Sequence, residues 1–133
     1  MSRSETVACP CQSGRAYAQC CAPLHRGEAV AATAEVLMRS RYSAYVHGDA
    51  DYLLQTWHAS TRPAALDFSD ATATRWLGLD VRRHEQHDSS HATVEFVARY
   101  RIRGAAAVRL HEVSRFVRED GRWYYLDGEF RSR

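Results

Sequence analysis

The chain has 133 residues, of which 45% are hydrophobic and 26% charged, and this length and composition suit one folded domain. The formal net charge of +2 is too small to indicate a nucleic-acid partner by itself. All 18 basic residues are arginine, and the absence of lysine excludes enzymes that depend on a lysine Schiff base or a phosphate-loop lysine. No apolar run approaches about 20 residues and no apolar segment precedes the first cysteine, so we expect a cytoplasmic protein with no membrane partner.

All four cysteines lie in one short segment, CPCQSGRAYAQCC, at residues 9–21. A disulfide between neighbouring cysteines here would close a strained ring, and disulfides are rare in the cytoplasm. Zinc prefers four soft ligands in a tetrahedron, and a turn at QSG would bring the two cysteine pairs together. A redox dithiol and plain buried cysteines are the alternatives. We predict one structural zinc ion, closed to catalysis, with these ligands: Cys9, Cys11, Cys20 and Cys21.

This segment resembles the SEC-C motif, a small zinc-binding segment named from the C-terminus of the bacterial preprotein translocase ATPase. The family pattern reads about C-P-C-G-S-G, then K/R-x-Y, and ends in C-C or C-H. Gln12 stands where glycine is usual, which adds strain if that position needs a positive φ. The resemblance implies a role in protein interaction, and residues 1–27 are predicted to form this zinc-binding segment. Many relatives carry a second motif at the C-terminus, which this chain lacks, so we expect one metal ion.

A connector with Pro23 and Gly27 as breakers is expected after the cysteines, followed by two helices. The first helix begins with Thr33 as its cap, carries apolar residues at helical spacing, and ends at Gly48. Asp49 is predicted to cap a second helix over residues 50–58. A short helical turn is expected further on, from residue 69 or 70.

From residue 76 onward the apolar pattern has a period of two. The predicted strands cover residues 76–86, 91–103, 106–119 and 122–128, and an Asp-Gly pair predicts a hairpin before the last one. Helices followed by a meander of antiparallel strands indicate an α+β domain, which we assign to residues 28–133.

Five stretches of the chain, LMRSRYSAYV, DADYLLQTWH, RWLGLDV, VEFVARY and SRFVREDGRWYYLDG, together resemble the YchJ-type family of bacterial proteins. The resemblance implies a nuclear transport factor 2-like (NTF2-like) cone, in which helices pack on a curved antiparallel sheet and enclose a pocket, behind an N-terminal zinc motif. It implies no reaction, because the family is biochemically uncharacterised.

Glu112 and Ser114 share the predicted inner face of the third strand with apolar residues. A buried carboxylate is costly unless it is paired. Three interpretations remain open: an ion pair between Glu112 and Arg39 or Arg41, a pocket acid or base, or a shifted strand register that leaves Glu112 in solvent.

Two further residues are candidates for proton transfer beside Glu112, namely His58 at the end of the second helix and Asp127 in the last strand, on the same face as Trp123 and Tyr125. Each also has a structural interpretation, His58 as a helix cap or surface residue and Asp127 as a turn residue. The predicted pocket is lined by Arg39, Arg41, Tyr42, Tyr45, Trp57, Glu112, Ser114 and Tyr125.

Three functions are compatible with the sequence. The leading hypothesis is a non-enzymatic module that binds a protein partner or a small ligand. The second is a hydrolase or isomerase of a small hydrophobic substrate that uses Glu112, with Tyr42, His58 or Asp127 assisting. The third is RNA or ribosome association, in which an outer stripe of arginines would contact phosphates. The alternative interpretation of this stripe is an ordinary solvent-exposed face of the sheet. These arginines are Arg99, Arg101, Arg103, Arg109 and Arg115. An exposed sheet face would favour a homodimer.

Overall fold

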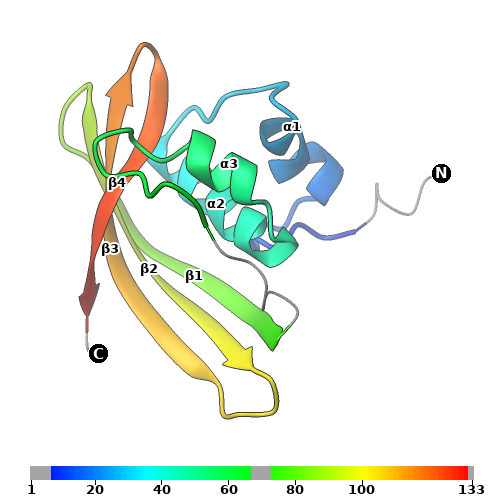
Figure 1. Ribbon diagram of the computed structural model, residues 1–133. Helices are drawn as coiled ribbons and strands as arrows, with labels where there is room; N and C mark the ends of the chain where they lie inside the picture. The colour runs from blue at the N-terminus through cyan, green and yellow to red at the C-terminus, as the bar shows by residue number, and fades with distance from the viewer. Residues whose placement is uncertain (1–6, 67–72, 132–133) are drawn as a thin grey trace.

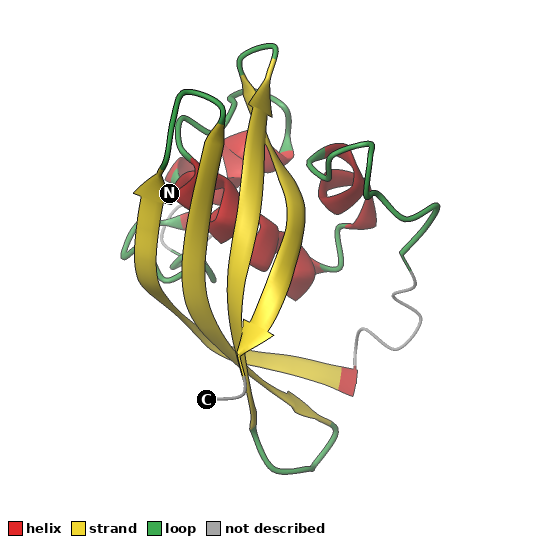
Figure 2. Ribbon diagram, turned by 90° about the vertical axis from the view of Figure 1, so that its left-hand side faces the viewer, coloured by secondary structure: helices red, strands yellow, loops and turns green. Residues whose placement is uncertain are grey.

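The computed structural model describes residues 7–66 and 73–131 and has the predicted α+β architecture. Four antiparallel strands follow one another across a single bent sheet in the order β1-β2-β3-β4, and the helices lie on one of its faces (Figure 1 and Figure 2). The elements are a 3₁₀ turn at Tyr17–Gln19, α1 at Cys21–His25, α2 at Ala34–His47, α3 at Ala50–Gln55, β1 at Thr74–Gln86, β2 at His91–Ile102, β3 at Val108–Glu119 and β4 at Arg122–Arg131. In the described part of the chain, every helix is too short or too polar to cross a membrane.

The main helix, α2, begins and ends where its capping residues predict. The Thr33 hydroxyl accepts a hydrogen bond from the Val36 amide, and Gly48 ends the helix in the left-handed conformation with φ of 69°. The Asp49 carboxylate then accepts from the Tyr52 amide at 3.1 Å and starts α3. The short connection sets α2 and α3 side by side over the sheet (Figure 1).

Two helix boundaries differ from the prediction. The predicted connector begins with helix α1, because Pro23 falls in the first helical turn, where a missing amide hydrogen costs nothing. Helix α3 ends at Gln55 rather than residue 58, because the chain beyond it pairs with β4: the Tyr125 amide donates to Thr56, and the His58 amide donates to Tyr125. The helical turn predicted at Ser69 or Asp70 lies outside the described residues.

The core forms between α2 and the inner face of the sheet. Inward side chains alternate along β2 and β3 as the period of two predicts, and they meet the apolar stripe of α2. Among the side chains of this cluster are Leu37, Met38, Val94, Phe116 and Trp123.

A β-bulge in β4 decides which residues reach the inner face near Glu112. Tyr125 lies opposite Phe116 and Asp127 lies opposite Arg115, so one extra residue stands between them. The extra residue turns Asp127 to the outer face, which corrects the prediction that it shares a face with Tyr125. The inner position goes instead to Gly128, where an added Cβ would lie 2.0 Å from Glu112 Oε2.

Gly128→Ala is therefore expected to lower the free energy of unfolding by about 1–3 kcal/mol, because the new methyl group would displace the buried Glu112 side chain. Chemical denaturation measures the loss. Gly104→Ala is the matched control, since a Cβ there would meet nothing within 4 Å and should change stability by less than about 0.5 kcal/mol. Equal losses in the two variants would contradict this account of Gly128.

Candidate functional site: a four-cysteine cluster and a pocket

The four cysteines converge at the N-terminal end of the structure. Their sulfur atoms all lie within 4.8 Å of one another, with 3.6 Å between Cys11 and Cys20 and 4.0 Å between Cys20 and Cys21. A tetrahedral ion with bonds of about 2.3 Å would hold its sulfur ligands about 3.8 Å apart. Cys9, Cys11 and Cys21 are buried and Cys20 is half-buried. The cluster therefore fits a metal site that is closed by four sulfur ligands.

The backbone of the loop explains the arrangement of the first cysteine pair. The Cys9 amide donates to the Arg15 carbonyl and the Gln12 amide donates to the Cys9 carbonyl, which makes a tight turn. Gln12 has φ of 64° and Gly14 has φ of 88°, both in the left-handed region. Gln12 thus adopts the conformation that favours glycine, the residue usual at this position of the SEC-C pattern, and it carries the strain.

The thiols of the cluster interact strongly with one another. Hydrogen bonds from the thiols of Cys11 and Cys21 lower the pKa of Cys9 to about 3, whereas hydrogen bonds with Cys11 and Cys9, together with burial, raise the pKa of Cys21. Without a metal ion, the cluster therefore favours a thiolate at Cys9 and a protonated thiol at Cys21. A bound cation would be needed to hold all four sulfurs as thiolates.

Polar contacts attach the cysteine loop to the α+β domain. The Gln12 side-chain oxygen accepts from the Leu79 amide of β1 at 3.1 Å, and Arg39 donates to the Cys11 carbonyl at 2.8 Å. The sulfur of Cys9 lies 3.9 Å from the Ser43 hydroxyl. Arg39 also pairs with Glu35 at 3.0 Å, so it faces the cysteine loop and does not line the cavity where it was predicted. Positions two apart on a helix point about 200° apart, which separates Arg39 from Arg41.

His25 joins the same segment to the helices without being a metal ligand. The Tyr17 hydroxyl donates to its Nδ1 at 2.7 Å, and its Nε2 donates to the Ser40 carbonyl at 2.9 Å. Both ring nitrogens are therefore engaged. The Ser40 hydroxyl in turn bonds the Tyr52 hydroxyl at 2.7 Å, so these contacts run from the cysteine segment through α2 to α3.

The Gln12 contact gives a prediction about the loop. Gln12→Ala should lower the free energy of unfolding by about 1 kcal/mol, because it removes the bond to Leu79 and keeps the strained φ. Gln12→Gly should stay closer to the natural protein, because glycine relieves about 1 kcal/mol of strain while losing the same bond. Thermal unfolding compares the two variants, and an alanine variant at least as stable as the glycine variant would refute the assignment.

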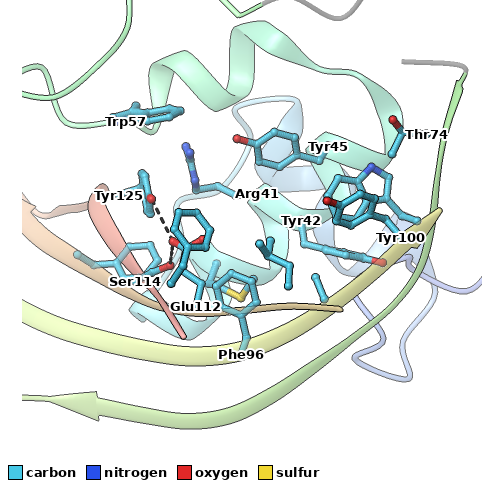
Figure 3. A pocket seen from close by; sticks show the side chains of 16 residues that line it. Arg41, Tyr42, Tyr45, Trp57, Thr74, Phe96, Tyr100, Glu112, Ser114 and Tyr125 are labelled. Atoms are coloured by element: carbon cyan, nitrogen blue, oxygen red, sulfur yellow. Dashed lines mark hydrogen bonds between the residues drawn. The ribbon is translucent and has the colours of Figure 1, made fainter. Parts of the chain in front are cut away.

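The second feature is a cavity of about 460 Å³ between α2 and the concave face of the sheet. Figure 3 shows side chains from α2, from the strands and from the segment after α3 directed into it. Seven predicted pocket residues line it, namely Arg41, Tyr42, Tyr45, Trp57, Glu112, Ser114 and Tyr125. The residues that sequence reasoning assigned only to the core or left unassigned are Met38, Thr74, Trp76, Phe96, Ala98, Tyr100, Leu110, Phe116 and Phe130. For Phe96, Ala98, Tyr100, Leu110 and Phe116 the strand alternation predicted an inward direction, but a core contact and a cavity wall share that pattern.

Arg41 places a buried positive charge in the cavity wall. It is 5% exposed, and its Nη1 donates to the Leu53 carbonyl and the Thr56 hydroxyl, both at 2.7 Å. Its guanidinium carbon lies 5.0 Å from the ring centre of Trp57 and 4.6 Å from that of Tyr125. Burial lowers the pKa of Arg41, but an arginine remains protonated in a protein.

Glu112 places a carboxylate in the same cavity, on the inner face that the strand alternation predicted. It is 7% exposed, and its Oε2 accepts from the Ser114 hydroxyl at 2.7 Å and from the Tyr125 hydroxyl at 3.1 Å. Burial and the nearby Glu112 charge raise the pKa of Tyr125, so its phenol stays protonated as a donor. Within residues 7–66 and 73–131, no ion pair joins Glu112 to an arginine, so the predicted pair with Arg39 or Arg41 is not formed.

The remaining candidates lie away from the cavity. His58 Nε2 lies 2.9 Å from Glu119 and its Nδ1 lies 2.7 Å from Ser60, and His58 does not line the cavity. Both Asp127 oxygens accept from Arg115 at 2.6 Å on the outer face, and this guanidinium lowers the pKa of Asp127. Neither residue is placed to assist Glu112.

The outer arginine stripe is present in part. Arg99 lies directly opposite Arg109 in the sheet register, and both are exposed, as are Arg101 and Arg103. Arg115 is neutralised by Asp127, so it is not available to the stripe.

Taken together, the fold and the cysteine loop define an NTF2-like α+β domain that carries a SEC-C motif. The family model "YchJ, middle NTF2-like domain" matches residues 33–128, and the model of the SEC-C motif matches residues 7–23. The chain belongs to the UPF0225 family of YchJ-like proteins. The fold and family predicted from the sequence are thereby confirmed.

The relatives cover nearly the whole chain. A UPF0225 protein from Ralstonia nicotianae is 61% identical over 93% of this chain and 92% of its own length, and one from Bordetella parapertussis is 55% identical over 96% of each. The solution structure of a SEC-C motif-containing protein from Rhodopseudomonas palustris matches with a TM-score of 0.81 and 38% identity, over 91% of this chain and 96% of that one. The crystal structure of a SEC-C motif-containing protein from Psychrobacter arcticus matches with a TM-score of 0.80 and 33% identity, over 93% of this chain and 82% of that one.

Proposed function

We propose that this protein binds a small, largely apolar molecule in the cavity of its NTF2-like domain, and that the cysteine cluster holds a structural zinc ion. The cavity carries this proposal. At about 460 Å³ it lies within the range of small-molecule sites, about 300–1,000 Å³, and its walls are mostly aromatic and aliphatic with a few convergent polar groups. A cavity of this size is much larger than a packing defect of a folded core.

The zinc ion would have a structural role. Four sulfur ligands fill a tetrahedral zinc site, so the ion would have no open position for water or substrate. The loop that would hold it contacts α2 through Arg39 and Ser43, while Arg41 and Tyr45 of the same helix line the cavity. Metal binding would thus fix the helix that forms one wall of the pocket. These buried contacts favour a structural role over a free hook for a protein partner.

A hydrolase or isomerase that uses Glu112 is the second candidate. Its support is the position of Glu112 in the cavity wall with no arginine paired to it and with a protonated Tyr125 beside it. A carboxylate and a phenol in one pocket are able to move a proton on a bound substrate. Because His58 and Asp127 lie elsewhere, this chemistry would rest on Glu112 and Tyr125 alone.

Ala98→Leu tests the binding function. Ala98 lines the cavity and is 1% exposed, so a leucine there would occupy space that the ligand needs. Binding of the neutral apolar fluorophore N-phenyl-1-naphthylamine, measured by fluorescence titration, should weaken by about fivefold or more, while the melting temperature stays equal or rises. Ala106→Leu, at an exposed position in the loop before β3, is the control and should bind the fluorophore like the natural protein. Unchanged binding in the Ala98 variant would place the fluorophore outside the cavity and refute the proposal.

Cys11→Ser tests the metal role. Cys11 is fully buried in the cluster, and a hydroxyl is a poor replacement for a thiolate ligand of zinc. Elemental analysis of protein purified without chelators should give about one zinc per natural chain and much less in the variant, with a lower melting temperature. Ser13→Ala, which removes only an exposed hydroxyl 3.1 Å from the sulfur of Cys20, should keep its zinc. A natural chain that contains no metal would exclude the structural zinc.

A further inference from the structure

Two opposite charges line the cavity, and each has polar atoms without a partner. Arg41 uses Nη1 for both of its hydrogen bonds, and its Nε and Nη2 have no hydrogen-bond partner among the residues that the structure describes. Glu112 uses Oε2 for both of its bonds, and its Oε1 likewise has no partner within the described ranges. Both side chains are more than nine-tenths buried and both line the cavity, so these unused atoms are available to a molecule inside it.

The two charged groups of the lining, Arg41 and Glu112, lie at one end of the cavity. Figure 3 shows Arg41, Trp57, Tyr125 and Glu112 close together, and Tyr100 at the opposite end. The rest of the lining is made mostly of apolar and aromatic side chains, with hydroxyl groups on Thr74 and three tyrosines. A ligand that fits this distribution has one polar end and an apolar body.

The two charges together select against a charged ligand. An anionic group would gain from Arg41 but would be repelled by Glu112, and a cationic group would meet the reverse situation. Both effects are stronger beside buried charges such as these than they are in bulk water. A neutral group that accepts from Arg41 and donates to Glu112 satisfies both residues at once, as a primary amide or a urea does.

From this arrangement we propose that the ligand is a neutral molecule with an apolar, ring-sized body and an amide-like head group, whose oxygen accepts from Arg41 and whose N–H donates to Glu112 Oε1. This inference rests on the proposed binding function and specifies the ligand class. Glu112 and Arg41 then determine specificity, because a ligand that lacks either polar group leaves a buried charge without a partner.

Four probes of nearly identical shape test the inference on the full-length protein: 1-naphthaleneacetamide, 1-naphthaleneacetate, 2-(1-naphthyl)ethylammonium and 1-ethylnaphthalene. Their affinities are measured by ¹H–¹⁵N NMR titration, with the indole N–H of Trp57 as a reporter in the cavity wall. The acetamide should bind about tenfold or more tightly than each of the other three.

Glu112→Gln tests the charge argument, because glutamine has nearly the same shape as glutamate but no charge. Removing the negative charge should tighten acetate binding and weaken ethylammonium binding, each by about tenfold. The acetamide should also weaken, because the glutamine oxygen accepts from Ser114 and Tyr125 and its NH₂ group then stands in the place of Oε1. Arg41 remains in place, so a shift of all four probes in the same direction would overturn the inference. If Glu112→Gln does not fold, the order of the four probe affinities in the natural protein still tests the inference.

The outcomes separate the two proposals. Acetate or ethylammonium binding as tightly as the acetamide overturns the neutral-ligand inference and leaves a binding cavity of another specificity. Equal binding of 1-ethylnaphthalene and the acetamide also overturns it, because the polar pair would then contribute nothing. Failure of all four probes to bind overturns the proposed function as well.

Discussion

The packing of α2 on two sides is the constraint on which the rest of the structure depends. One side of this helix contributes Leu37 and Met38 to the core on the sheet and Arg41 to the cavity wall, and another side contacts the cysteine loop through Arg39 and Ser43. A helix of 14 residues gains little stability from its own backbone and depends on such packing. Helix α2 therefore connects the cysteine loop to the cavity, although the residues of the two sites come from different segments of the sequence.

The cavity combines features that a folding core normally avoids. A buried guanidinium and a buried carboxylate are each costly to remove from water, and in this cavity they do not neutralise each other directly. The fold offsets the cost locally, since Leu53 and Thr56 accept from Arg41 while Ser114 and Tyr125 donate to Glu112. Local compensation on separate elements keeps the two charges apart and leaves space between the helix and the sheet. That space distinguishes a binding site from an ion pair that would only tie α2 to β3.

One extra residue in β4 shows how a local irregularity decides the composition of the site. Because the side-chain direction alternates at every residue, the bulge after Tyr125 exchanges the faces of everything that follows it. Asp127 turns outward to Arg115, and Gly128 makes room for the carboxylate of Glu112. Without the bulge, a second carboxylate would face the cavity beside the first.

The sequence by itself determined the α+β class, the caps of α2, the strand alternation that directs Glu112 inward and the cysteine set that matches a metal site, because each of these depends on residue type at short, regular spacing. Only the tertiary structure decided that Arg39 serves the cysteine loop, that Asp127 points outward, and that Glu112 and Arg41 share a cavity without pairing. The rotation of α2, the single bulge in β4 and the separation between α2 and the sheet result from many packing contacts between segments that are distant in the sequence. A local pattern of residues contains no information about those contacts, so it cannot predict these three features.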